Sequence, residues 1–149
     1  MNRMAAWALL GALAGCAPVY TMTPPEGFVR YEKRKGLAFI TADGVQVRGR
    51  TVKNYPKADL PFWADAMERH LVARGYLLHG KTCFKTAAGR DGCTAEFVLP
   101  HGGEDWVLAE TVFVHGDHLA LVEATGPFDR YKKAAPAIAK ALQSFEIAE

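Results

Sequence analysis

Apolar and polar positions change their spacing along the chain, and each spacing predicts an element. Phe28–Tyr31 and Leu37–Thr41 are mostly apolar and suit short strands, and Asp43-Gly44 is typical of a hairpin turn. The segment Val45–Val52 alternates, which predicts a strand with one buried face. One face would carry Val45, Val47 and Thr51, and the other Gln46, Arg48 and Arg50.

A helical pattern follows. Asp59 is a plausible N-cap, Pro61 fits the first turn, and Gly75 is a natural stop. Between them, residues at three-and-four spacing follow one face of a helix: Trp63, Met67, Leu71 and Arg74, with Ala66 and His70 beside them.

The next segments read as four strands separated by turns, which predicts an antiparallel meander. Asp91-Gly92, His101–Asp105 and His115–Asp117 punctuate the apolar runs. The predicted strands are Tyr76–Lys85, Cys93–Leu99, Trp106–Val114 and Leu119–Ala124.

A second helix is predicted at the C-terminal end. Pro127 fits its first turn, whereas Pro136 lies in the interior and should kink or divide it. Its apolar stripe consists of Phe128, Tyr131, Ala135, Ile138, Leu142 and Phe145. The predicted class is therefore α+β, an antiparallel sheet of about six to seven strands flanked by two helices.

The first residues follow a different pattern. Arg3 precedes a short apolar run, Met4–Leu13, and small residues follow, as in an export signal. About 20 apolar residues are needed to cross a bilayer, so this run does not predict a transmembrane anchor. We expect a signal peptide over residues 1–15, an extended tether over 16–27, which is rich in proline, and one domain over 28–149.

The segment Leu13-Ala14-Gly15-Cys16 resembles the lipobox of bacterial lipoproteins. The resemblance implies cleavage before Cys16 and a lipid on its thiol, which would hold the protein to a membrane. Ala17 in place of Asp resembles the pattern of outer-membrane lipoproteins, with the domain facing the periplasm. An ordinary secretory signal beside an unrelated cysteine is the alternative.

The remaining cysteines, Cys83 and Cys93, then form a pair in an oxidising compartment, where disulfides persist. They lie on either side of a turn-rich stretch, so two neighbouring strands could bring them together. A redox or metal-binding pair is the alternative. There is no C-x-x-C spacing and no nearby histidine pair with zinc-ligand spacing, which favours a structural disulfide.

The order of elements, with Pro25-Glu26-Gly27-Phe28 before the first strand, Phe62-Trp63 in the first helix and Leu142–Phe145 at the end, resembles the PsbP-like α/β/α sandwich. That superfamily includes the photosystem II extrinsic protein and a nuclear import factor that binds a Ran GTPase. Its members do unrelated jobs, mostly binding or assembly. The resemblance therefore implies a fold and carries over no functional residue.

Several polar groups are candidates for chemistry. His115, Asp117 and His118 lie in one turn and could hold a metal, with His101, Glu104 and Asp105 possible neighbours. These residues are also ordinary turn residues, and no cofactor is predicted. His70 and His79 have no evident ligand partner. Trp63, Trp106 and Phe62 are interpreted as core aromatics or as contacts to a partner.

Two carboxylates, Glu110 and Glu123, fall within apolar strands and could be neighbours. They could form an acid–base pair, but an outward orientation or pairing with Arg48 or Arg50 across the sheet is the commoner arrangement. Ser144 is the only serine after the predicted cleavage site, and it is not in a nucleophile motif. The sequence therefore predicts no enzyme.

The net charge of the chain is +2, from 18 basic and 16 acidic side chains, and predicts no nucleic-acid partner. We expect a membrane-anchored, non-enzymatic module that binds an envelope protein or assists envelope assembly. The alternative is a lipoprotein that binds a small ligand or a metal for a transport system.

Overall fold

The computed structural model describes residues 19–32 and 36–148. The predicted signal peptide and Cys16 lie outside these residues, so the lipid anchor stays a prediction. The elements in chain order are β1 (Val19–Thr21), β2 (Val29–Arg30), β3 (Ala38–Ile40), β4 (Gln46–Lys53), α1 (Leu60–Ala73), β5 (Leu77–Lys85), β6 (Asp91–His101), β7 (Glu104–His115), β8 (His118–Pro127), α2 (Phe128–Gln143) and β9 (Glu146–Ala148).

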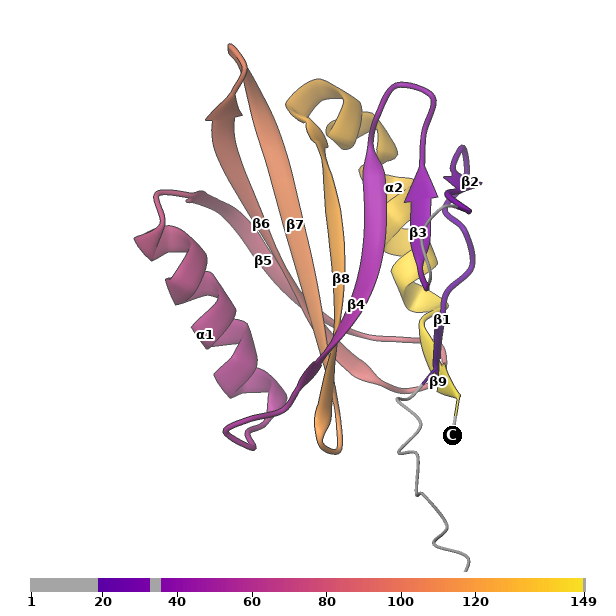
Figure 1. Cartoon of the computed structure of the whole chain (residues 1–149), viewed down its shortest axis with the longest axis vertical. Coiled ribbons are helices and arrows are strands. Elements are labelled where there is room, and N and C mark those ends of the chain that lie inside the picture. Colours follow the sequence, from indigo (N-terminus) through magenta and orange to yellow (C-terminus); the bar gives the residue numbers. More distant parts are fainter. Residues whose placement is uncertain (1–18, 33–35, 149) are drawn as a thin grey trace, which may run out of the picture.

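The centre of the fold is a seven-stranded sheet in the order β2-β3-β4-β8-β7-β6-β5. Every neighbouring pair is antiparallel, as the sequence predicts. The helices α1 and α2 lie on opposite sides of this sheet (Figure 1). The predicted α+β class and the sheet flanked by two helices are confirmed.

Helix α1 begins as predicted. The Asp59 carboxylate accepts a hydrogen bond from the Phe62 backbone N–H at 3.1 Å, which caps the first turn. Ala64 and Leu71 are buried on its inner face. They pack on sheet residues that point to this side, namely Cys93, Ala95, Phe97, Val112 and Leu121.

Helix α2 is one continuous helix, so the prediction that Pro136 would divide it is wrong. Pro136 lies on the exposed side of α2, as does Lys132, whose carbonyl loses its helical partner. Water can replace that partner there. On the inner side, Tyr131, Ile138 and Leu142 hold both halves of the helix against one core.

The predicted tether is shorter than expected. Val19–Thr21 forms β1, which pairs with β9 next to the large sheet, so the domain begins before residue 28. The Tyr20 ring stacks on Phe145 at a centroid distance of 5.6 Å, and Met22 is buried. The proline content of residues 16–27 predicted an extended segment without a partner. The sequence did not indicate β1, because its partner β9 lies at the far end of the chain.

Gly92 was expected in a turn but lies inside β6. The turn comes earlier, at 87–89. A Cβ atom on Gly92 would lie 2.5 Å from the Phe113 ring, so the glycine makes room for a buried aromatic side chain. That ring stacks on Phe145 at 3.9 Å, in the main core between the sheet and α2.

Candidate functional site

Each helix covers only part of its face of the sheet, and a hollow is left beside each. The first, which we call the α2 cavity, has a volume of about 290 Å³ and lies between α2 and strands β5 to β8. The second, the α1 groove, has a volume of about 590 Å³ and lies between α1 and strands β4, β7 and β8. The two hollows differ in how their charged groups are paired.

Small residues create the α2 cavity. Gly80, Glu96, Ala109 and Ala124 lie opposite one another in one row across β5, β6, β7 and β8. Three of these four have little or no side chain. On the helix above them, Ala135 and Ala139 also line the cavity. Small side chains on both walls leave space that larger apolar residues would fill.

The next row across the same strands consists of Thr82, Thr94 and Thr111. The hydroxyl oxygens of Thr94 and Thr111 are 2.6 Å apart and share a hydrogen bond. Thr111 is buried, whereas Thr82 is exposed at the outer strand. Exposure to solvent along this row therefore increases from Thr111 through Thr94 to Thr82.

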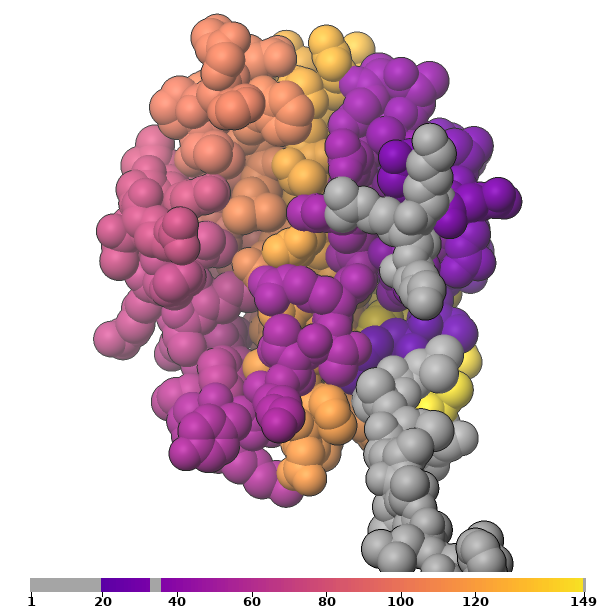
Figure 2. All heavy atoms as spheres, in the orientation of Figure 1, coloured from indigo at the N-terminus to yellow at the C-terminus, as the bar shows by residue number. Residues whose placement is uncertain are grey.

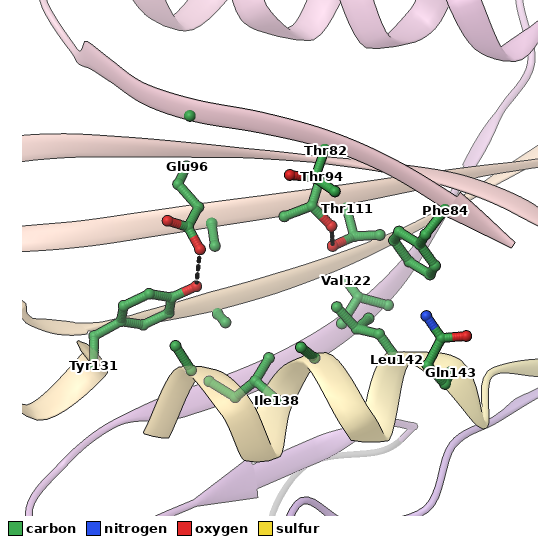
Figure 3. Close-up of a pocket in the computed structure, with 15 residues that line it drawn as sticks. Thr82, Phe84, Thr94, Glu96, Thr111, Val122, Tyr131, Ile138, Leu142 and Gln143 are labelled. Carbon is green, nitrogen blue, oxygen red and sulfur yellow. Dashed lines mark hydrogen bonds between the residues drawn. The ribbon is translucent and has the colours of Figure 1, made fainter. Parts of the chain in front are cut away.

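Glu96 and Tyr131 form the polar pair of the cavity. The Tyr131 hydroxyl donates a hydrogen bond to Glu96 Oε1 at 2.9 Å. Burial, and then the charge of Glu96, raise the pKa of Tyr131 far above its usual range, so the hydroxyl keeps its proton and acts as a donor. The pair lies at one end of the cavity, with Phe84 and Gln143 at the other (Figure 3).

The cavity opens between β5 and α2, where Thr82, Ala139 and Gln143 are exposed. Val122, Ile138 and Leu142 form its apolar wall. Glu96 and Tyr131 were not recognised as site residues from the sequence. The alternation in β6 places Glu96 on the face opposite Cys93, Ala95 and Phe97, but only the position of α2 shows that this face is covered too.

The α1 groove contains the carboxylate pair that the sequence singles out. Glu110 and Glu123 lie opposite each other on β7 and β8. Arg50 contacts both, at 3.1 Å from Glu110 and 3.4 Å from Glu123, and Arg48 lies 3.3 Å from Glu123. The predicted pairing with Arg48 and Arg50 across the sheet is confirmed. Figure 2 shows atoms of β7 and β8 between α1 and β4 on this face.

The carboxyl of Glu110 is the more buried of the pair, with 9% of its side chain exposed. Burial, and then the charge of Glu123, raise its pKa, while Arg50 acts in the opposite direction. Two arginines balance two glutamates, so the network is neutral. The structure supports a role in holding β4, β7 and β8 in register.

The candidate metal ligands lie at the β7–β8 turn, where His115 and His118 are opposite residues. The Asp117 carboxylate is bound to Lys57 Nζ at 2.9 Å, and His115 Nδ1 lies 3.4 Å from an Arg90 nitrogen. Within the described ranges, no three His, Cys, Asp or Glu side chains are grouped to hold a metal ion.

The other histidines have aromatic or open surroundings. His101 contacts the Trp106 ring edge-on at 5.5 Å, away from the β7–β8 turn, and Glu104 and Asp105 are exposed in the same hairpin. His79 contacts Phe128 at 5.9 Å, and His70 is exposed on α1 beside the groove.

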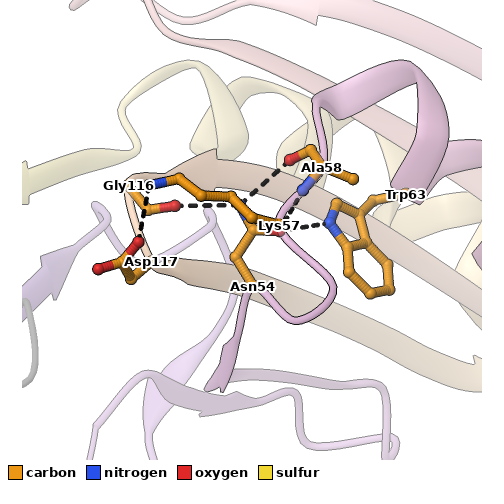
Figure 4. A network of polar contacts seen from close by, with 6 residues as sticks. All are labelled: Asn54, Lys57, Ala58, Trp63, Gly116 and Asp117. Carbon is orange, nitrogen blue, oxygen red and sulfur yellow. Dashed lines mark hydrogen bonds and ion pairs between the residues drawn. The ribbon is translucent and has the colours of Figure 1, made fainter.

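Beside the β7–β8 turn, Asn54 forms a buried polar centre that the sequence did not indicate. Its side-chain amide donates to the carbonyls of Ala58 and Gly116, and its oxygen accepts from the Ala58 N–H and from Trp63 Nε1 at 2.7 Å. Figure 4 shows these bonds joining the start of α1 to the turn. Trp63 is therefore a structural aromatic, whereas Phe62 is half exposed.

Cys83 and Cys93 lie opposite each other on β5 and β6 and form a disulfide, as the sequence predicts. Neither helix in the described part of the chain is long and apolar enough to span a membrane.

No model of a protein family matches the chain, and no curated protein matches it in sequence. Solved structures do resemble it. LpqN of Mycobacterium tuberculosis, which is involved in cell envelope biogenesis, matches with a TM-score of 0.69 at 9% identity, over 89% of this chain and 85% of its own. Cyanobacterial PsbP (CyanoP) from Synechocystis sp. PCC 6803 matches with a TM-score of 0.59 at 13% identity, over 93% and 99%.

The fold is PsbP-like. A protein of unknown function from Pseudomonas aeruginosa, PA94, described as a putative regulator, is also similar, with a TM-score of 0.57 at 14% identity over 96% of both chains. At these identities the likeness establishes the fold alone, because one fold serves many functions.

Proposed function

We propose that this chain is a lipid-anchored, non-enzymatic binding module of the bacterial cell envelope, and that it binds a small ligand in the α2 cavity. The observation that carries the proposal is the cavity itself. Its walls are mostly apolar, and its polar side chains are the threonine row, the Glu96–Tyr131 pair and Gln143. Ligand sites in proteins have this composition, and 290 Å³ is close to the lower end of their usual size, about 300 Å³.

The chemistry of the cavity supports binding rather than catalysis. The Thr94 and Thr111 hydroxyls bond to each other, and no described residue that lines the cavity is a His, Lys or Cys. A threonine hydroxyl is a weak nucleophile unless a base activates it. Tyr131 keeps its proton, for the reasons given above.

The anchor and the location rest on the first residues. The lipobox-like segment ending at Cys16 supports lipidation, and Ala17 supports placement in the outer membrane, with the domain facing the periplasm. More than one acyl chain on the same cysteine would give a stable hold, because a single chain binds a membrane only reversibly. The envelope role of LpqN is consistent with this location.

Mass spectrometry of the protein extracted from its own membranes tests the anchor. We expect Cys16 as the first residue, carrying a diacylglyceryl group, in the outer-membrane fraction. An intact Met1 or an unmodified Cys16 thiol would refute the lipid anchor, and would leave the proposed ligand binding in the α2 cavity unaffected.

Native mass spectrometry of the full chain in detergent tests the cavity. We expect a copurifying small molecule with the unmodified protein and with Ala137→Leu, and none with Ala135→Leu. Ala135 lines the cavity, whereas Ala137 lies on the same helix outside it, so the two variants add the same bulk in different places. Retention of the molecule by Ala135→Leu would refute the assignment.

An envelope protein partner is a second proposal, and the outer strand β5 favours it. In the described part of the chain, β5 pairs only with β6, and its other edge is open. It presents Leu77 and Leu78, which are 68% and 41% exposed. Open strand edges can bind an extended segment of another protein. A photocrosslinker at Leu77 should capture one envelope protein in stoichiometric amount, and the same probe at Glu26 should not.

A further inference from the structure

We infer that the α2 cavity selects a small organic cation, an apolar molecule with one protonated amine that lies against Glu96. The inference rests on the proposed binding function and names the chemical class of the ligand. It starts from a difference between the two hollows. In the α1 groove each glutamate is matched by an arginine. Among the described residues, Glu96 forms no salt bridge at all.

The half-buried Glu96 has few neighbours that could compensate its charge. Its cross-strand neighbours are Gly80 and Ala109, which offer no polar side chain. Tyr131, above it, is buried. A ligand that brings a positive charge to this position can form a charge-assisted hydrogen bond with the carboxylate, which is stronger than a hydrogen bond between neutral groups.

The hydrogen-bonding capacity of Glu96 also fits an ammonium group. Tyr131 donates to Oε1, and a carboxylate has two oxygens with about four acceptor positions. No described donor bonds to Oε2. An ammonium group has only donors, so it complements an acceptor that is partly used.

Other ligand classes fit less well. An anion would meet the Glu96 charge, and none of the described lining residues carries a positive charge to offset it. A divalent metal ion needs several ligating side chains, and this cavity offers one carboxylate without a histidine or cysteine. A neutral alcohol can bond to Oε2 but leaves the charge uncompensated.

Apart from the threonine row and Gln143, the rest of the cavity is lined by apolar side chains and glycine, which suit a hydrocarbon. Ile138 lies between the polar pair and the far end, where Val122, Leu142 and Phe84 line the cavity. A chain or ring attached to the amine would therefore run along α2, away from Glu96 toward Phe84 (Figure 3). The expected ligand is a compact primary amine with one apolar part.

Calorimetric titration of the full chain in a non-ionic detergent tests the inference with three probes of one length: hexylamine, 1-hexanol and hexanoate. A blank titration into detergent alone corrects for partitioning. We expect hexylamine to bind at least about tenfold more tightly than hexanol, and hexanoate to bind more weakly still. This comparison uses the unmodified protein, so it does not depend on whether a variant folds.

The variant Glu96→Gln removes the charge and keeps an oxygen that can accept from Tyr131. We expect it to weaken hexylamine binding by about tenfold and to leave hexanol binding unchanged. The matched control is Glu104→Gln, which removes the same charge from the exposed first residue of β7, outside the cavity, and should change neither.

The variant Tyr131→Phe separates charge from positioning. It removes the donor but leaves the carboxylate, so hexylamine binding should persist. Equal losses in Glu96→Gln and Tyr131→Phe would mean that Glu96 only positions Tyr131, and would overturn the inference. Equal binding of hexanol and hexylamine would overturn it too but leave the cavity a ligand site. Hexanol bound equally by the unmodified protein and by Ala135→Leu would refute the site itself.

Discussion

Glu110 on β7 and Glu123 on β8 lie directly opposite each other, and one arginine, Arg50, contacts both carboxylates. Like charges at opposite positions of two strands normally destabilise a sheet. Arg50 remains half exposed while Glu110 is buried, so the compensation is incomplete and the pKa of Glu110 stays above its ordinary value of 4.5.

This raised pKa predicts a pH dependence of stability. The folded protein binds a proton at Glu110 more tightly than the unfolded chain does. Its contribution to stability is therefore fully present below pH 4.5 and is lost as the pH rises through the raised pKa. In Glu110→Gln this decline is absent. The free energy of unfolding of the variant, relative to that of the unmodified protein, should therefore increase as the pH rises from about 4 to 7.

Urea unfolding at several pH values measures the difference. Arg50→Gln provides a comparison of opposite sign, because loss of the arginine raises the pKa of Glu110 further and should make the decline steeper. Parallel pH profiles for Glu110→Gln and the unmodified protein would contradict the prediction.

The same strands show what the sequence could predict. Alternation over Val45–Val52, which covers most of β4, places Val45 and Val47 on one face and Arg48 and Arg50 on the other, and this follows from the two-residue period alone. The register of β4, β7 and β8 then brings the arginines to Glu110 and Glu123. Such local patterns also located the helices and the disulfide.

The α2 cavity could not be predicted in the same way. Its volume depends on which small residues of α2 cross over which small residues of the sheet, and Ala135 and Ala109 are 26 positions apart in the chain. Alanine is common in helices and strands, so its presence alone does not predict a cavity. The contact of Val19–Thr21 with the C-terminal strand β9 was missed for the same reason, because only the folded chain brings them together.

Gly92 should not tolerate a side chain. In Gly92→Ala the new methyl group would lie 2.5 Å from the ring of Phe113, which is fully buried and stacked on Phe145. Displacing a packed ring should lower the free energy of unfolding by about 1–3 kcal/mol, measured by urea unfolding.

The matched control is Gly80→Ala, on the strand next to β6. A Cβ atom there meets nothing within 4 Å, so the variant should be about as stable as the unmodified protein. Equal stability of Gly92→Ala would show that Phe113 has more room than the structure gives it.

Asn54 should contribute strongly to stability through its hydrogen bonds. It is 6% exposed, and its side chain serves two carbonyls, a backbone N–H and the Trp63 indole. Asn54→Leu has a similar volume but leaves these groups without a partner, at about 1–3 kcal/mol for each group that stays buried. We expect a loss of at least about 2 kcal/mol, together with a change in Trp63 fluorescence.

Lys57→Ala serves as its control. Lys57 bonds to Asp117 in the same region, but both side chains are exposed, so this ion pair should add nothing measurable. A loss of stability as large in Lys57→Ala as in Asn54→Leu would mean that the whole turn, rather than Asn54, is sensitive to change.

The Cys83–Cys93 disulfide should hold β5, the outer strand, to the sheet. The two cysteines are ten residues apart, and a crosslink closing so short a loop stabilises a protein by about 2–3 kcal/mol in the chain-entropy model. The double variant Cys83→Ala, Cys93→Ala should lose about this amount. Because β5 has one neighbour whereas β4 has two, amide exchange should accelerate most within Leu77–Lys85 and change little in β4. Uniform acceleration across the sheet would contradict a local role, and free thiols at both positions in native protein would contradict the disulfide itself.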